Sequence, residues 1–172
     1  MKHWAWSIPV VALSGIAFGG PPKPPPPNQA GVNHKELKCD EVVPQALRDK
    51  YLPGMVLKQS GRVPLECNFE DPKVLGSMAL LSIDCSKPKL PGDRLAAALE
   101  VLKKSGKDGK NIPGLGQGAA QVMFGGTEQI HVHDDKTPCK LVFGFGPQGP
   151  KTDHVEYARG VVAALTPPVV GM

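Results

Sequence analysis

Four cysteines constrain the fold of this chain more than any other feature, because an apolar segment typical of an export signal precedes them. In an oxidising compartment an even number of cysteines favours disulfide bridges, and four cysteines allow three different pairings. A structural metal site built from all four thiolates is disfavoured, because no two of the cysteines are close in the sequence. They are Cys39, Cys67, Cys85 and Cys139.

Residues 1–19 are predicted to be a secretory signal peptide. Lys2 and His3 form a short polar start, an apolar run from Ile8 to Phe18 follows, and small residues come next. This run is shorter than the stretch of about 20 apolar residues that a transmembrane helix needs. We therefore expect export to the periplasm, the cell surface or the medium and no transmembrane helix in the mature chain, with a retained N-terminal anchor as the alternative.

Residues 20–32 are predicted to be a proline-rich linker. Six of the seven positions 21–27 are proline, which favours an extended polyproline II conformation and a stiff, exposed spacer. A ligand for a proline-recognising groove is the alternative function for this segment.

The charge of the chain argues against a nucleic-acid partner. The formal net charge is +4, from 20 basic and 16 acidic residues that are scattered without a basic run or interleaved aromatic residues. An envelope or extracellular protein is the partner that we expect instead.

Residues 33–172 have the length of one domain, and their periodicity is mixed. Apolar residues at helical spacing predict three helices, whereas alternating or continuous apolar runs predict about five strands. The stretch 105–118, SGKDGKNIPGLGQG, is expected to be irregular. The helices are predicted at residues 43–51, 93–104 and 153–165, and the strands at 63–70, 77–85, 119–124, 128–133 and 140–145.

The order of these elements predicts a single two-layer α+β domain. Short connections between the last three strands favour an antiparallel meander, and helices with one apolar face need a sheet to cover. We expect all three helices on one side of a mostly antiparallel sheet. Asp93 is expected to cap the second helix, and Asp153 with Glu156 the last one.

The predicted elements favour one of the three cysteine pairings. One cysteine precedes the first helix and the next lies in the first strand, whereas the third ends a strand and the fourth begins another. We therefore expect the bridges Cys39–Cys67 and Cys85–Cys139. Each bridge should contribute about 3 to 4 kcal/mol in the chain-entropy model.

Three segments resemble a family of small exported domains of unknown function. They are ECNF at 66–69, the turn IPGLGQGA at 112–119 and the closing helix EYARGVVAAL at 156–165. Similar domains occur in actinobacterial lipoproteins and in the extracellular sensors of some bacterial serine/threonine kinases. This chain departs from the lipoproteins because it lacks a lipid-bearing cysteine. The resemblance implies a binding or sensing module and transfers no catalytic residue.

No segment matches a known catalytic motif. GLGQG at 114–118 looks like a phosphate-binding loop, but it follows a loop, enters a strand and lacks the lysine and hydroxyl of a P-loop. A close backbone turn is the better interpretation. Because the cysteines are better used in bridges than as nucleophiles, we expect no enzymatic activity.

The segment His131-Val132-His133-Asp134-Asp135 is the one concentrated group of reactive side chains. Residues two apart on a strand point to the same face, so the two imidazoles are candidate ligands for one Cu, Zn or Ni ion. Asp134 is the expected third ligand, with Asp135 or His154 as alternatives. The competing interpretation is a polar, solvent-facing strand surface that binds no metal.

These patterns leave three functional hypotheses. The first is a non-enzymatic envelope module that binds a partner protein or a small ligand. One version of this hypothesis is a subunit of a surface assembly. The second is a periplasmic metal-binding protein that uses His131 and His133. The third, a hydrolase or inhibitor with an unrecognised site, has no motif in its favour.

Overall fold

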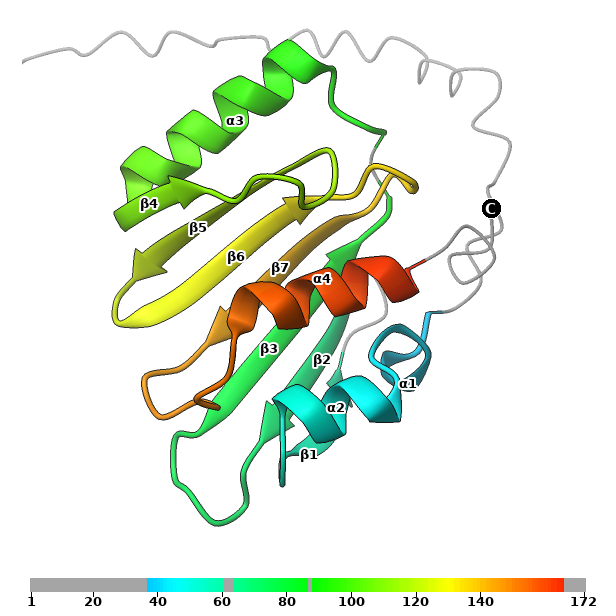
Figure 1. Cartoon of the computed structure of the whole chain (residues 1–172), viewed down its shortest axis with the longest axis vertical. Coiled ribbons are helices and arrows are strands. Elements are labelled where there is room, and N and C mark those ends of the chain that lie inside the picture. The colour runs from blue at the N-terminus through cyan, green and yellow to red at the C-terminus, as the bar shows by residue number, and fades with distance from the viewer. Residues whose placement is uncertain (1–36, 61–63, 87, 166–172) are drawn as a thin grey trace, which may run out of the picture. The chain divides into compact units, whose positions relative to one another are not determined.

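The computed structural model describes residues 37–60, 64–86 and 88–165, which form one seven-stranded sheet and four helices. The strand order is β1-β2-β3-β7-β6-β5-β4, and all neighbouring strands are antiparallel (Figure 1). The predicted antiparallel α+β domain is confirmed, but the expected counts of strands and helices are too low. The strands are β1 (Val56–Ser60), β2 (Leu65–Glu70), β3 (Met78–Asp84), β4 (Lys107–Asn111), β5 (Gly118–Phe124), β6 (Thr127–His133) and β7 (Lys140–Phe145).

One side of the sheet, here called the core face, carries most of the hydrophobic core. It is covered by α1 (Cys39–Val42), α2 (Gln45–Tyr51) and α4 (His154–Ala164), and Figure 1 shows α4 lying across β7 and β3 with α1 and α2 beside it. The ring of Tyr157 in α4 meets Phe143 and Phe145 of β7 edge-on, with centroids 5.7 and 6.0 Å apart. The buried side chains of β6 and β7 that belong to this face are Ile130, Val132, Leu141, Phe143 and Phe145.

The remaining helix, α3 (Gly92–Ser105), lies on the opposite side of the sheet, here called the second face. A Cβ atom added to Gly118 would lie 3.0 Å from Leu99 Cδ1 and 3.1 Å from Leu95 Cδ2. Gly118 pairs with His133, whose side chain alternates with the buried Val132 and therefore points away from the core face. The expectation that every helix covers one side of a two-layer domain is wrong for α3.

The helix α3 covers only the β4–β5 end of the second face. Ala120 and Val122 of β5 are fully buried there, and Leu95 of the helix is 4% exposed. In Figure 1 the helix lies along β4 and β5, at the end of the sheet farthest from β1. The central strands are therefore left without a helix on this face in the described part of the chain.

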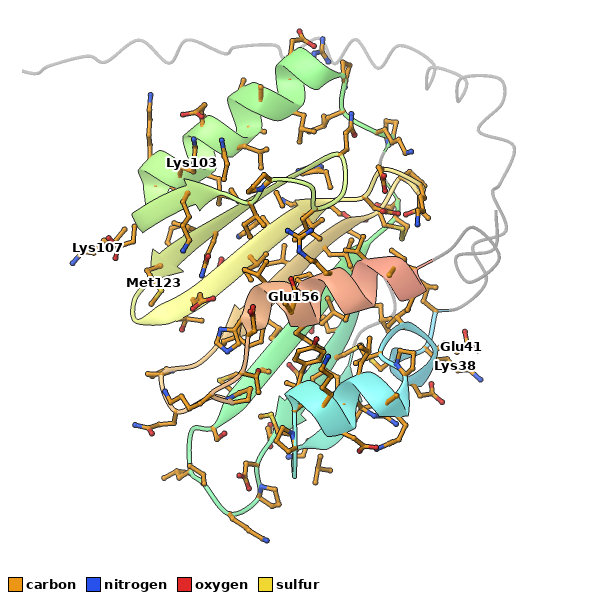
Figure 2. The ribbon with its side chains drawn as sticks, viewed as in Figure 1. Lys38, Glu41, Lys103, Lys107, Met123 and Glu156 are labelled. Carbon is orange, nitrogen blue, oxygen red and sulfur yellow. A yellow bond between two sulfur atoms is a disulfide. The ribbon has the colours of Figure 1, made fainter. Side chains whose placement is uncertain are left out.

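The two edge strands, β1 and β4, were not predicted. All five residues of β4 are exposed, their register shifts between Lys107 and Lys110, and Asp108 has a φ of 55°. This strand is held by backbone hydrogen bonds to β5, which leave no hydrophobic pattern in the sequence. Figure 2 shows Lys107 beside its partner Met123 at this edge of the sheet.

The helix termini follow the predicted signals in part. The Asp153 carboxylate accepts hydrogen bonds from the backbone N–H groups of Val155 and Glu156, so the predicted N-cap of α4 is confirmed. The Glu156 side chain pairs with Arg159 instead of completing the cap. The cap predicted at Asp93 is wrong, because α3 begins one residue earlier, after Pro91, and Asp93 lies in its first turn without capping it.

Two disulfides join distant parts of the domain, with the pairing expected from the sequence. Cys39–Cys67 links α1 to β2, and Cys85–Cys139 links the end of β3 to the residue before β7. In the described residues no cysteine is left as a free thiol.

The predicted signal peptide (1–19) and proline-rich linker (20–32) lie outside the described residues. Among the helices that are described, none combines the length and the apolarity that a bilayer crossing needs.

Candidate functional site

Polar residues from neighbouring strands form a row across the second face. His133 of β6 pairs with Lys140 of β7, and Lys140 pairs with Asp84 of β3. Directly paired residues of antiparallel strands have their Cβ atoms about 5 Å apart on the same side of the sheet. The next row holds His131, Val142 and Ser82.

A pocket of about 400 Å³ opens over these rows, beside α3. Its floor is the second face of β3, β6 and β7, and one wall is made by α3 and the residues that precede the helix. The β6–β7 connection also lines the pocket, next to the Cys85–Cys139 bridge. The lining residues are Pro64, Ser82, Asp84, Pro88, Lys89, Leu90, Ala98, Gln117, His133, Asp134, Pro138, Cys139, Lys140 and Val142.

Both histidines of β6 are held in the neutral form at pH 7. Burial, with smaller effects from Lys140 and His133, lowers the pKa of His131 to about 4. Burial and Lys140 also lower the pKa of His133. Of the two, only His133 lines the pocket, whereas His131 Nε2 lies 3.0 Å from the side-chain oxygen of Gln129.

Asp134 follows β6 directly, lines the pocket and is 1% exposed. Its Oδ2 accepts hydrogen bonds from the backbone N–H of Thr137 at 2.8 Å and from Thr137 Oγ1 at 2.5 Å. Its Oδ1 is also buried, and it has no hydrogen-bond partner in the described part of the chain. Backbone bonding of Asp134 N to the Cys139 carbonyl fixes the residue in place.

The structure brings only part of the predicted metal set together. His131 and His133 share the second face as expected, but His154 stacks on Phe145 on the core face and is therefore separated from them by the sheet. Asp135 is exposed, and its carbonyl accepts a hydrogen bond from Lys89. Across the described ranges, no group of three or more His, Cys, Asp or Glu side chains could hold a metal ion. A metal bound to the histidine pair would thus need further ligands from solvent.

The glycine-rich segment 114–118 is a close turn, in agreement with the sequence. Gly114 and Gly116 have φ values of 65° and 58°, and a Cβ atom on Gly116 would lie 2.3 Å from the His133 carbonyl oxygen. The backbone N–H of Gln117 donates to that same oxygen at 2.7 Å. The turn therefore closes against the end of β6 instead of opening around a phosphate.

Several pocket residues were missed by the sequence analysis. Ser82 and Asp84 alternate with the buried Leu81 and Ile83 along β3, so an alternating pattern marks them as one face of a strand. The approach of Ala98 from α3 has no sequence signal, because it depends on which side of the sheet the helix takes.

The comparisons with known proteins give no match: no family model, no curated protein and no solved structure matches this chain. The resemblance to exported lipoprotein and sensor domains therefore stays a prediction.

Proposed function

We propose that this chain is a non-enzymatic exported module of the cell envelope that binds a small ligand or a segment of a partner protein. The pocket of about 400 Å³ beside α3 is the observation that carries the proposal. Sites for small ligands are commonly hollows of about 300–1,000 Å³ lined by apolar side chains and a few placed polar groups. Leu90, Ala98 and Val142 supply the apolar lining here, and His133, Lys140 and Asp134 supply the polar groups.

The disulfides support export. The bridges Cys39–Cys67 and Cys85–Cys139 require an oxidising compartment to persist, which agrees with the signal peptide predicted at residues 1–19. The resemblance to extracellular sensor domains agrees with a binding role in the same compartment.

The test is a thermal-shift screen of the chain purified from cells that export it. The compounds are amino acids, dipeptides, sugars and small carboxylic acids, because a ligand that binds only the folded protein raises its Tm. We expect at least one of these classes to raise the Tm. Ala98→Phe should remove that shift by filling the pocket.

A matched control is available on the same helix. Ala97 and Ala98 are both exposed residues of α3, but only Ala98 lines the pocket. Ala97→Phe should therefore leave the thermal shift unchanged. Binding of a small ligand in this pocket is contradicted if no compound raises the Tm, or if both variants respond to ligand like the wild type.

A partner protein would be recognised by the same comparison. Wild-type protein and both variants are used as bait in envelope extracts. A partner that uses the pocket should be retained by the wild type and by Ala97→Phe and lost with Ala98→Phe. Equal retention by all three baits would place the partner elsewhere.

A second candidate function is metal binding by His131 and His133. The observation in its favour is that both imidazoles share the second face and have lowered pKa values, since neutral imidazole is the form that binds metal. Calorimetric titration with Zn²⁺, Cu²⁺ and Ni²⁺ tests it. We expect about one bound ion per chain, lost in the His131→Gln/His133→Gln variant and kept in His154→Gln. Equal uptake by both variants would contradict this function.

A further inference from the structure

The carboxylate of Asp134, a lining residue of the pocket, has one buried oxygen without a hydrogen bond among the described residues. Asp134 Oδ1 has no hydrogen-bond donor in the described part of the chain, although Oδ2 of the same group receives two from Thr137. Buried carboxylate oxygens are normally hydrogen-bonded, and leaving one unsatisfied destabilises the folded protein. A ligand that donates a hydrogen bond to Oδ1 would recover that cost.

The charges that line the pocket balance. Lys89 and Lys140 are the cations of the lining, and Asp84 and Asp134 are its anions. A ligand with a single charge would therefore give the occupied pocket a net charge, whereas a ligand with one positive and one negative group keeps the balance.

The two lysines of the lining differ in their contacts. Lys140 lies on the floor of the pocket, between His133 and Asp84 in the cross-strand row. The other lysine, Lys89, already donates to the Asp135 carbonyl. Lys140 is therefore the cation that is placed to meet an anionic group, and Asp134 the anion that is placed to meet a donor.

Much of the remaining lining is apolar and rich in proline. Three prolines, at positions 64, 88 and 138, form a proline rim together with Leu90 and Ala98, and Val142 adds an apolar side chain to the floor. Proline has few conformations to lose, so such a rim binds an apolar side chain at a small entropic cost.

We propose that the pocket binds a small zwitterion of the amino-acid or dipeptide type, whose ammonium group contacts Asp134 and whose carboxylate contacts Lys140. The apolar side chain of the ligand packs on the proline rim. This inference rests on the proposed function, because it names the class of ligand for the same pocket.

Four forms of one dipeptide test the two charged contacts separately. The forms are the free dipeptide, its N-acetyl derivative, its C-terminal amide and the doubly blocked compound. Binding of each form to the full chain, purified after export, is measured by calorimetry. The same set of forms is prepared for four different apolar dipeptides. Charge-assisted hydrogen bonds are worth about 1.5–3 kcal/mol, so each block should weaken binding about tenfold or more.

Two variants assign the contacts. Asp134→Asn keeps an oxygen for Thr137 and should remove the preference for the free over the N-acetyl form. Lys140→Met should remove the preference for the free over the amide form. Because this variant leaves Asp134 unchanged, it tests the contact with the ligand carboxylate even if Asp134→Asn fails to fold. Lys104→Met, at an exposed lysine of α3 outside the pocket, is the control and should bind like the wild type.

The outcomes separate this inference from the proposed function. If the doubly blocked dipeptides bind as tightly as the free ones, or if no dipeptide binds while another compound class does so in an Ala98-dependent way, the zwitterion assignment is wrong and the binding function stands. If no compound of any class shows binding that Ala98→Phe removes, and no envelope protein is lost from the Ala98→Phe bait, both are wrong.

Discussion

The imidazole of His154 stacks on the ring of Phe145, with the ring centroids 3.7 Å apart and the planes inclined by 2°. His154 Nδ1 lies 3.1 Å from Glu128 Oε1, and its Nε2 lies 2.9 Å from the Pro150 carbonyl oxygen. Gln121 donates to the same oxygen of Glu128 at 2.7 Å. The first residue of α4 is thereby fixed to β5, β6 and β7 on the core face.

We expect His154 and Glu128 to be energetically coupled. His154→Phe keeps an aromatic ring for stacking but removes the hydrogen bonds, and should lower the free energy of unfolding by about 1–2 kcal/mol. Glu128→Gln should cost less in the His154→Phe background than in the wild type, with a coupling energy of about 1 kcal/mol. Urea unfolding of the four proteins, followed by circular dichroism, measures the coupling. Additive losses would show that the contact contributes nothing.

Gly116 should tolerate no side chain. Its φ of 58° is left-handed, and a Cβ atom there would lie 2.3 Å from the His133 carbonyl oxygen. Gly125 has a similar φ of 54° but nothing within 4 Å of its Cβ position, which makes it the matched control. Gly125→Ala should cost about 1 kcal/mol from backbone strain alone, and Gly116→Ala about 2 kcal/mol more, because the backbone must shift. If denaturant unfolding shows the same loss of unfolding free energy for both variants, the turn is not in close contact with β6.

Each disulfide should carry a large share of the stability. Replacing both cysteines of either bridge with alanine removes a cross-link over 28 or 54 residues, which should lower the free energy of unfolding by about 3 to 4 kcal/mol in the chain-entropy model. Loss of Cys39–Cys67 should also leave a cavity, because both residues are fully buried. Urea unfolding of the two double variants is the measurement. A loss below about 1 kcal/mol for either would show that its bridge does not constrain the unfolded chain.

The stability of the domain should fall on mild acidification in a way that depends on His131. Its pKa is lowered from 6.5 in an unperturbed histidine to about 4 in the folded protein. The unfolded chain therefore binds a proton at a pH where the folded protein still does not. The contribution of His131 is complete above about pH 6.5 and is lost as the pH falls toward about 4.

Thermal unfolding at several pH values tests this dependence. The decrease in Tm between about pH 7.5 and about pH 4.5 should be smaller in His131→Gln than in the wild type. Lys104→Gln, at an exposed residue of α3, serves as the control and should keep the wild-type decrease. An unchanged decrease in His131→Gln would contradict burial of this imidazole.

The candidate site was predictable only where it follows strand periodicity. The alternation in β6 correctly places His131 and His133 on one face, and the Asp153 signal correctly marks the start of α4. The edge strand β4 was missed because its residues are exposed and its backbone hydrogen bonds leave no hydrophobic pattern.

The sequence by itself determined most of the elements whose side chains are buried and the order in which they occur, because burial imposes a period of two on strands and of 3.6 on helices. The short helix α1, with its buried Cys39 and Val42, was missed. The sequence also favoured the two cysteine pairs. Only the tertiary structure decided which side of the sheet α3 covers, since an amphipathic helix buries its apolar stripe equally well on either face. That choice places Ala98 over the row of His133, Lys140 and Asp84 and creates the pocket beside the buried carboxylate of Asp134.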